Sequence, residues 1–243
     1  MMMLNLNLSK GRQWLAAGVA LACWAGVLPA IAGMSITPVA VELSGMKRVG
    51  RVTITNTGTT PVIIQSGSAL WSQVNNVDRY DETDALLVVP AIVEIPAKTS
   101  QLFRVTLRGA FPKAGEQAFR LYLEDVTDFT EGKGVNLRIR HDLPVMVAGA
   151  AAGKALPRLG ACADPAPAGC VRLSNDGSRR LKTQRIFVEG AGWHKDLKTP
   201  TVVLAGAWKE WTFELPPHGS GSMKVTAETS GGPVSAELSL PPR

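Results

Sequence analysis

Apolar and polar residues alternate with a period of two in short segments along most of the chain after residue 32. This period places successive side chains on opposite faces of an extended strand, so each segment predicts a β-strand with one face in a core. Turn residues separate the segments about every eight to twelve positions, the rhythm of an antiparallel sandwich. No long segment with the helical period follows residue 32, and the sequence therefore predicts an all-β protein. The strands expected in the first half lie at 35–43, 51–57, 62–65, 85–89, 91–95, 101–107 and 118–126.

A run of small residues at 148–153 interrupts this pattern and has the composition of a linker. We therefore divide the chain into a first domain at 33–148, a linker at 149–155 and a second domain at 156–243. Each domain has the size of an immunoglobulin-like β-sandwich and is large enough to bury its own core. The strands expected in the second domain lie at 170–174, 185–189, 201–204, 209–215, 222–226 and 234–240.

The first 32 residues have the organisation of a secretory signal peptide. Lys10 and Arg12 precede a short apolar run, and a small-residue cleavage site ends at Ala32. The alternative is a lipoprotein signal ending before Cys23, which is disfavoured because it would shorten the apolar run and place Trp24 beside the modified cysteine. No second apolar run of membrane length follows. We therefore expect a soluble, exported mature protein without an integral membrane segment.

Two cysteines, Cys162 and Cys170, remain once the signal segment is removed, and they flank a stretch that contains proline and glycine. In an oxidising compartment this arrangement favours a hairpin disulfide. Two free thiols are the alternative. A catalytic pair is disfavoured, because the spacing does not match a redox motif.

The segment 134–147 alternates over a much longer stretch than an average strand. It follows the strand expected at 118–126 across a loop, so the two predict a long hairpin. One interpretation is a half-buried strand whose apolar face completes its own core. The other interpretation is an edge strand that pairs with a partner, because the apolar stripe is longer than one small sandwich can cover and Pro144 favours an edge position. The apolar positions of the stripe are Val135, Leu137, Ile139, Leu143, Val145 and Val147.

In the order of its motifs the chain resembles the PapD-like periplasmic chaperones, which assemble bacterial pili together with an outer-membrane usher. The first domain carries SITPVAVELSG, RVTITNTGTTPV, VVPAIVEIPAKTSQLFRV, GEQAFRLYLEDV and GVNLRIRHDLPVMV, and the second carries RLSNDGSRRLKTQRI and VVLAGAWKEWTFELP. The resemblance implies two immunoglobulin-like sandwiches in a boomerang arrangement, a periplasmic location, and pilin subunits and the usher as partners. It also implies donor-strand complementation, in which the end of the first domain supplies a strand that the pilin lacks. Val135, Leu137 and Ile139 would then enter the pilin groove.

The chain departs from the better-known branch of this family at the residues that hold the pilin's C-terminal carboxylate. By our alignment those positions are Ala40 and Pro144, and neither can bind a carboxylate. The chain is more similar to the divergent archaic or alternative branch, in which an arginine in the preceding strand resembles Arg120. Arg138 and Arg140, on the polar face of the donor strand, are the next candidates. The alternative for Arg120 is an ordinary cross-strand ion pair with Asp142, expected if the hairpin is centred near residue 131.

Other function classes receive little support from the sequence. No nucleophile–base motif, phosphate-binding loop or zinc motif is present, so we expect no enzyme activity, nucleotide, metal or other cofactor. The weak net charge of +6 and the few aromatic residues do not indicate nucleic-acid binding. The acidic run at 78–84 does not match a calcium loop and is expected to be a solvated loop, as is the basic cluster at 179–182, with usher contact as a lesser alternative. A secreted all-β pilus subunit or adhesin is the alternative function.

Overall fold

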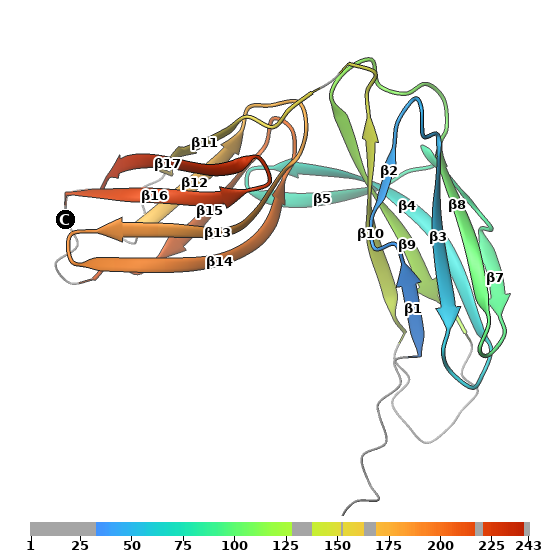
Figure 1. Cartoon of the computed structure of the whole chain (residues 1–243). Coiled ribbons are helices and arrows are strands. Elements are labelled where there is room, and N and C mark those ends of the chain that lie inside the picture. The colour runs from blue at the N-terminus through green and yellow to red at the C-terminus, as the bar shows by residue number, and fades with distance from the viewer. Residues whose placement is uncertain (1–32, 128–137, 152, 163–168, 217–220, 241–243) are drawn as a thin grey trace, which may run out of the picture.

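The computed structural model describes residues 33–127, 138–151, 153–162, 169–216 and 221–240. These residues form strands and turns without a helix, arranged as two lobes that meet at an angle (Figure 1). The predicted all-β class and boomerang arrangement are therefore confirmed. No helix in the described ranges is long and apolar enough to span a membrane. The signal segment lies outside the described residues.

The first lobe is a sandwich of two sheets. The four-stranded sheet has the order β1 (Met34–Thr37), β3 (Val49–Asn56), β8 (Ser100–Leu107) and β6 (Leu86–Val89). The six-stranded sheet has the order β2 (Val41–Leu43), β10 (Arg140–Ala148), β9 (Glu116–Asp125), β4 (Val62–Val74) and β5 (Val77–Glu82), and β7 (Ile92–Ile95) pairs with β4.

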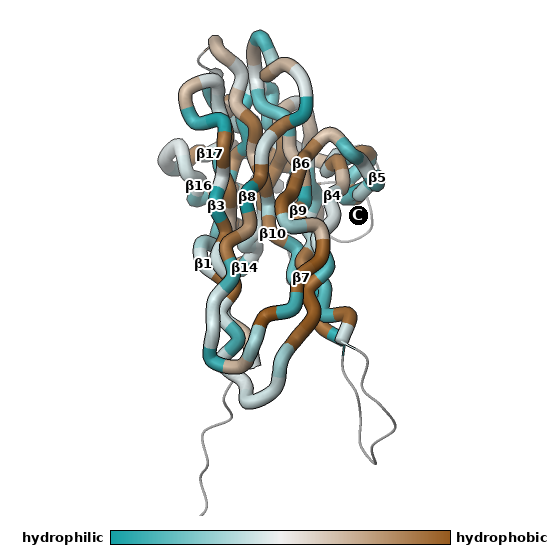
Figure 2. Tube along the Cα trace, turned by 90° about the vertical axis from the view of Figure 1, so that its right-hand side faces the viewer, coloured by the Kyte–Doolittle hydropathy of each residue, from teal (hydrophilic) through white to brown (hydrophobic). Residues whose placement is uncertain are grey.

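Alternation places the apolar residues of both sheets in one core. Val52 and Ile54 of β3 and Phe103 of β8 meet Leu121 and Leu123 of β9, and all five side chains are fully or almost fully buried. Figure 2 shows the outer side of the four-stranded sheet, where hydrophilic positions alternate with these core positions along β3 and β8.

The segment at 35–43 is divided between two sheets, although its pattern predicted one strand. β1 pairs with β3 in the four-stranded sheet, whereas β2 runs parallel to β10 in the six-stranded sheet. Pro38 lies between them and has no N–H to continue a ladder, so the chain crosses from one sheet to the other at this point.

The second lobe contains a three-stranded and a four-stranded sheet, with a core that includes Val171, Leu173, Ile186 and Val225. The three-stranded sheet has the order β11 (Pro157–Gly160), β12 (Gly169–Asn175) and β15 (Trp208–Phe213). The other has the order β14 (Trp193–Val203), β13 (Leu181–Gly190), β16 (Ser222–Thr229) and β17 (Gly232–Ser239).

A buried asparagine organises the same corner in each lobe. Asn56 ends β3, donates to the carbonyl of Thr60 at 2.8 Å and to that of Ile95 at 3.0 Å, and accepts from the amide of Gly58 at 2.9 Å. Asn175 ends β12 and makes the same pattern of bonds. It donates to the carbonyl of Arg179 at 2.7 Å and accepts from the amide of Gly177 at 3.1 Å. Each side chain thus satisfies backbone groups that would otherwise be buried without a partner.

The composition at 148–153 predicted a linker, and the described residues there are tied to the first lobe. The amide of Gly149 donates to the carbonyl of Gly115 at 2.7 Å, and that of Ala150 donates to Pro112 at 3.2 Å. The last strand of the first lobe ends at Ala148, and the first strand of the second lobe begins at Pro157.

Candidate functional site

Strand β10 has a free edge along its first half. β9 pairs with β10 over its whole length, but on the other side β2 pairs only with Val145, Met146 and Val147. The carbonyl of Ile139 accepts from the amide of Asp125 at 3.0 Å, so the odd-numbered residues direct their peptide groups to β9. Arg140 and Asp142 therefore direct theirs to the open edge. No strand among the described residues covers this edge, which is a template for strand addition.

The apolar face of β10 continues past the end of its own core. Leu143, Val145 and Val147 are buried in the first lobe, as the interpretation of a half-buried strand expects. Ile139 lies on the same face and is 47% exposed. Val135 and Leu137 lie outside the described residues. The described part of the stripe is thus partly a core strand and partly an apolar extension without cover.

The hairpin register differs by two residues from the one we expected. Pro144, rather than Asp142, lies opposite Arg120, and Asp142 lies opposite Tyr122. Asp142 instead forms an ion pair with Arg140, at 3.0 Å between Oδ1 and Nε. The predicted cross-strand pair between Arg120 and Asp142 is therefore wrong, because the register places its members beside other neighbours.

Arg120 lies in a cage of aromatic side chains instead. Its guanidinium carbon is 4.0 Å from the ring centroid of Trp71 on β4 and 5.5 Å from that of Tyr80 on β5. The guanidinium Nε is buried and has no hydrogen-bond partner among the described residues. A buried donor without a partner is costly, and a guanidinium is a group that binds oxyanions well.

The position of Arg120 relates directly to the two lost anchor positions. Pro144 is its cross-strand neighbour on β10, and Ala40 immediately precedes Val41, which lies opposite Val145. The three positions therefore belong to neighbouring strands at one level of the sheet. Ala40 and Pro144 carry no positive charge, and Arg120 on the adjacent strand β9 carries one.

Arg138 and Arg140, the other two candidates, are both exposed. Arg140 stacks on Tyr122, with its guanidinium carbon 4.2 Å from the ring centroid, and is engaged by Asp142. Burial, followed by the charge of Asp142, raises the pKa of Tyr122, which therefore stays neutral at ordinary pH. Among the three, Arg120 is the one with a buried donor that the described residues leave without a partner.

The hairpin of β4 and β5 extends from the first lobe to the second (Figure 1). Gln73 donates to the carbonyl of Val202 and accepts from the amide of Leu204, both at 2.8 Å. At the hairpin's turn, the backbone carbonyl of Asn76 accepts a hydrogen bond from Lys209 Nζ at 2.9 Å. The acidic run at 78–84 was expected to be a solvated loop, but Val77–Glu82 forms strand β5, because it pairs with β4.

Asp78 is the charged centre of this contact between the lobes. Its carboxylate accepts from Trp71 Nε1 and Gln73 Nε2, both at 2.8 Å, and from Lys209 Nζ at 2.7 Å. Burial alone would raise the pKa of Asp78, but the hydrogen bonds from Lys209, Gln73 and Trp71 outweigh it and lower the pKa below 3.8. Trp71 therefore connects the Arg120 cage with the contact to the second lobe.

A second clamp joins the lobes through Arg180. Its guanidinium forms ion pairs with Glu116 on β9 and Glu42 on β2, and its amide donates to Glu116 at 3.0 Å. The side chain of Glu116 is only 3% exposed, so the pair is largely desolvated. The cluster at 179–182 was expected to be a solvated loop, and for Arg180 this prediction is wrong, because the angle of the lobes brings the two carboxylates to it.

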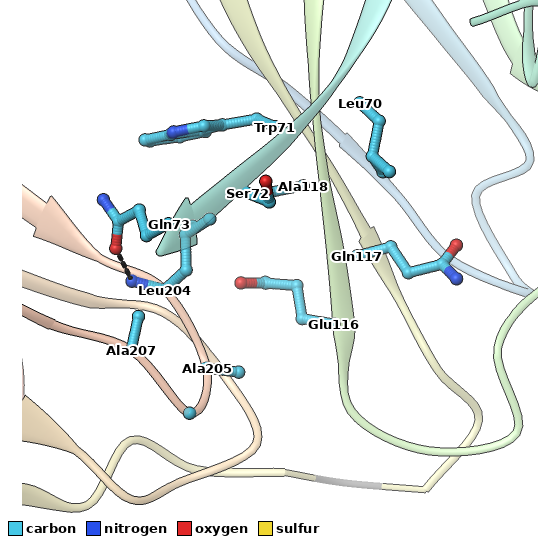
Figure 3. Close-up of a pocket in the computed structure, with 11 residues that line it drawn as sticks. Leu70, Trp71, Ser72, Gln73, Glu116, Gln117, Ala118, Leu204, Ala205 and Ala207 are labelled. Carbon is cyan, nitrogen blue, oxygen red and sulfur yellow. Dashed lines mark hydrogen bonds between the residues drawn. The ribbon is translucent and has the colours of Figure 1, made fainter. Parts of the chain in front are cut away.

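A pocket of about 260 Å³ lies between the lobes beside these contacts (Figure 3). Trp71, Gln73, Glu116 and Ala118 line it from the first lobe, and the turn from Leu204 to Ala207 lines it from the second. Its walls are of mixed polar and apolar character, and Glu116 is already bound by Arg180.

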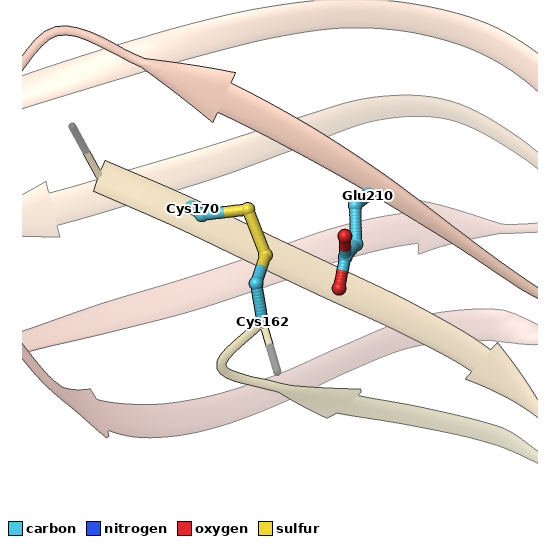
Figure 4. A group of neighbouring side chains, drawn as sticks. All are labelled: Cys162, Cys170 and Glu210. Atoms are coloured by element: carbon cyan, nitrogen blue, oxygen red, sulfur yellow. A yellow bond between two sulfur atoms is a disulfide. The ribbon is translucent and has the colours of Figure 1, made fainter. Parts of the chain in front are cut away.

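The two cysteines of the second lobe are joined in the structure by the disulfide that the sequence predicts, with their Cα atoms 5.8 Å apart (Figure 4). Glu210 lies close enough to their sulfur atoms to resemble a metal-binding group. However, both sulfur atoms are bonded to each other, and Glu210 forms an ion pair with Arg172 at 2.7 Å. The group therefore offers no free ligand set.

Comparisons with known proteins agree with this architecture. The model of the family "Pili and flagellar-assembly chaperone, PapD N-terminal domain" matches residues 33–151. No curated protein matches the chain.

Solved structures of pilus chaperones resemble the fold. A chain of the CsuC–CsuE chaperone–tip subunit complex, from archaic chaperone–usher pili of Acinetobacter baumannii, is 18% identical, with a TM-score of 0.64 and coverage of 86% of this chain and 99% of that one. A chain of the SafA pilin–SafB chaperone complex of Salmonella enterica is 15% identical, with a TM-score of 0.58 and coverage of 84% and 95%. The CupB2 chaperone of Pseudomonas aeruginosa is 14% identical, with a TM-score of 0.56 and coverage of 85% and 100%.

Proposed function

We propose that this chain, which belongs to the family of pili and flagellar-assembly chaperones, stabilises pilin subunits in the periplasm by donating strand β10 and delivers them to an outer-membrane usher. The observation that carries the proposal is the open edge of β10 from Arg140 to Asp142. The same segment presents Ile139, which is apolar and about half exposed, on the face that would meet a pilin groove. Strand addition supplies affinity through main-chain hydrogen bonds, and alternate apolar side chains supply specificity.

In this proposal the donor strand begins before the described part of β10. Val135, Leu137 and Ile139 fill the pilin groove, while Leu143, Val145 and Val147 hold the strand in the chaperone's own core. This division of roles explains why the alternating stripe is longer than one sandwich needs. Pro144 ends the donated edge, since it has no N–H to offer.

Arg120 anchors the pilin's C-terminal carboxylate in this account. Its guanidinium is held against Trp71 and Tyr80, and a guanidinium can bind both oxygens of a carboxylate. This assignment places the chain in the archaic or alternative branch of the family. Arg138 and Arg140 are the alternatives.

A pair of matched substitutions tests the donor strand. Ile139→Arg should abolish co-purification of a co-expressed pilin, because the charge would enter an apolar groove. Val89→Arg is the control, since Val89 is exposed to a similar extent, 49%, but lies on β6 at the other sheet. Circular dichroism of both variants reports whether they fold. If Ile139→Arg retains the pilin as well as Val89→Arg does, β10 is not the donor.

The alternative function, a structural pilus subunit or adhesin, is less consistent with these observations. A pilin subunit should be one incomplete sandwich, whereas this chain has two lobes with separate cores. Self-assembly of the purified chain into fibres would favour the alternative. A chain that remains unassembled and protects a separate pilin from aggregation would favour the chaperone.

A further inference from the structure

The junction between the lobes carries a shallow pocket of about 510 Å³ whose ionisable lining residues are all cationic. Lys154 lies in the segment between the lobes, Arg179 and Arg180 lie in the turn just before β13, and Lys182 is the second residue of that strand. Ala155 and the turn at Ser230 and Gly231 complete the lining. This pocket is distinct from the Arg120 cage, with which it shares no residue.

Backbone hydrogen bonds fix the segments that carry these cations. The amide of Ser178 donates to the carbonyl of Lys154 at 3.0 Å, which holds the segment between the lobes against the turn before Arg179. The amide of Ser230 donates to the carbonyl of Lys182 at 2.8 Å, and the amide of Lys182 donates to Ser230 Oγ at 3.2 Å. The backbone therefore converges on the pocket from three parts of the chain, so little chain entropy remains to be lost on binding.

The charges around the pocket do not balance. Glu116 and Glu42 are both bound to Arg180, and Arg179 lies 3.7 Å from Glu116. No carboxylate within the described ranges forms an ion pair with Lys154 or Lys182. Four cations thus meet two carboxylates, and the two lysines contribute the excess charge.

We propose that this junction pocket binds an oxyanion of the phosphate class. Lys154, Lys182 and Arg179 line the same pocket, and the charge of a dianion matches the two uncompensated lysines, whereas a single carboxylate would balance only one of them. The hydroxyl of Ser230 adds a donor, because its oxygen already accepts from Lys182. Bound phosphate would connect the segment between the lobes to the second lobe, next to the clamp that Arg180 forms with the first. Occupancy would therefore stiffen the angle between the lobes.

Titration of the full mature chain with inorganic phosphate tests the proposal. Calorimetry against chloride at equal ionic strength should give saturable binding, and phosphate should raise the melting temperature, because a ligand that binds the folded state alone stabilises it. The variant Lys154→Ala/Lys182→Ala should bind phosphate at least tenfold more weakly. The control Lys195→Ala/Lys198→Ala removes the same charge from exposed positions on β14 and should bind as the unaltered chain does. Circular dichroism checks that both variants fold.

A parallel arm distinguishes free phosphate from a lipid headgroup. Sedimentation with phosphatidylglycerol vesicles, compared with neutral phosphatidylcholine vesicles, should show no binding if free phosphate is the ligand, and lysine-dependent binding if the headgroup is. The proposal is overturned if neither probe binds saturably, or if the control variant loses as much affinity as Lys154→Ala/Lys182→Ala. Pilin binding is measured separately and can fail or succeed independently of this site.

Discussion

Replacement of Arg120 by methionine should separate binding from stability. Methionine keeps the apolar stem but removes the guanidinium, so the variant loses the stacking on Trp71 and Tyr80. That loss costs about 0.5–2 kcal/mol of folding free energy. The variant also removes a buried, unpartnered donor, which relieves about 1–3 kcal/mol. The two effects oppose each other, so the free energy of unfolding should fall by no more than about 1 kcal/mol.

Pilin binding should respond very differently to the same change. Loss of a buried, charge-assisted contact costs about 2–5 kcal/mol of binding free energy, because the partner's carboxylate is left unpaired. This corresponds to a loss of affinity of roughly thirtyfold to several thousandfold. The pilin affinity of Arg120→Lys should lie between those of the unaltered chain and Arg120→Met, since an ammonium keeps the charge but cannot bind both oxygens in one plane.

The assay is pilin affinity together with denaturant unfolding for Arg120→Met, Arg120→Lys and Arg140→Met. Arg140 is the matched control, because it also stacks on an aromatic ring but is exposed and already paired with Asp142. Its loss should change binding by at most about 1 kcal/mol. Unchanged binding by Arg120→Met, or an equal loss in Arg140→Met, would refute the assignment of the anchor.

Three further predictions concern the contact between the lobes and the second lobe. Arg180→Ala should lower the unfolding free energy by about 3–5 kcal/mol, since it leaves the buried Glu116 carboxylate unpaired. Arg158→Ala is the control and loses only a fully exposed pair, so its unfolding free energy should stay nearly unchanged in the same denaturant titration. The pKa of Asp78 is lower in the folded state than its ordinary 3.8, so its contribution to stability is present above about pH 4 and is lost as the pH falls through the folded pKa. Acid titration should therefore destabilise the unaltered chain more than Asp78→Asn between pH 5 and pH 3, and equal pH dependence would contradict this. Reduction of the disulfide should lower the stability of the second lobe by about 2–3 kcal/mol, as measured by calorimetry with and without reductant.

The alternation of apolar residues predicted most of the strands and their buried faces, but it missed β5 and β11 and could not give the hairpin register. A shift of two residues keeps every side chain on the same face, so the pattern of β10 is equally consistent with Asp142 or Pro144 opposite Arg120. The actual register depends on the loop that joins the two strands, and its composition does not specify it.

The alternation of apolar residues also could not predict contacts between segments that are far apart in the sequence. The acidic run around Asp78 has the composition of a loop, and its role depends on Lys209 of the other lobe. Arg120 was identified through a resemblance, but Trp71 and Tyr80 become its neighbours only through the order of strands in the six-stranded sheet. Domain boundaries at 33–148 and 156–243 remain a prediction.

Hydrogen–deuterium exchange of the chaperone, free and bound to its pilin, tests the donation of β10 most directly. The amides of Arg140 and Asp142 point to the open edge, so they should exchange rapidly in the free protein and become protected in the complex. The amides shared between β16 and β17 are already paired and should not change. Protection confined to the segment up to Asp142 would support donor-strand complementation. Unchanged exchange at Arg140 and Asp142 in a complex that is fully formed would contradict it.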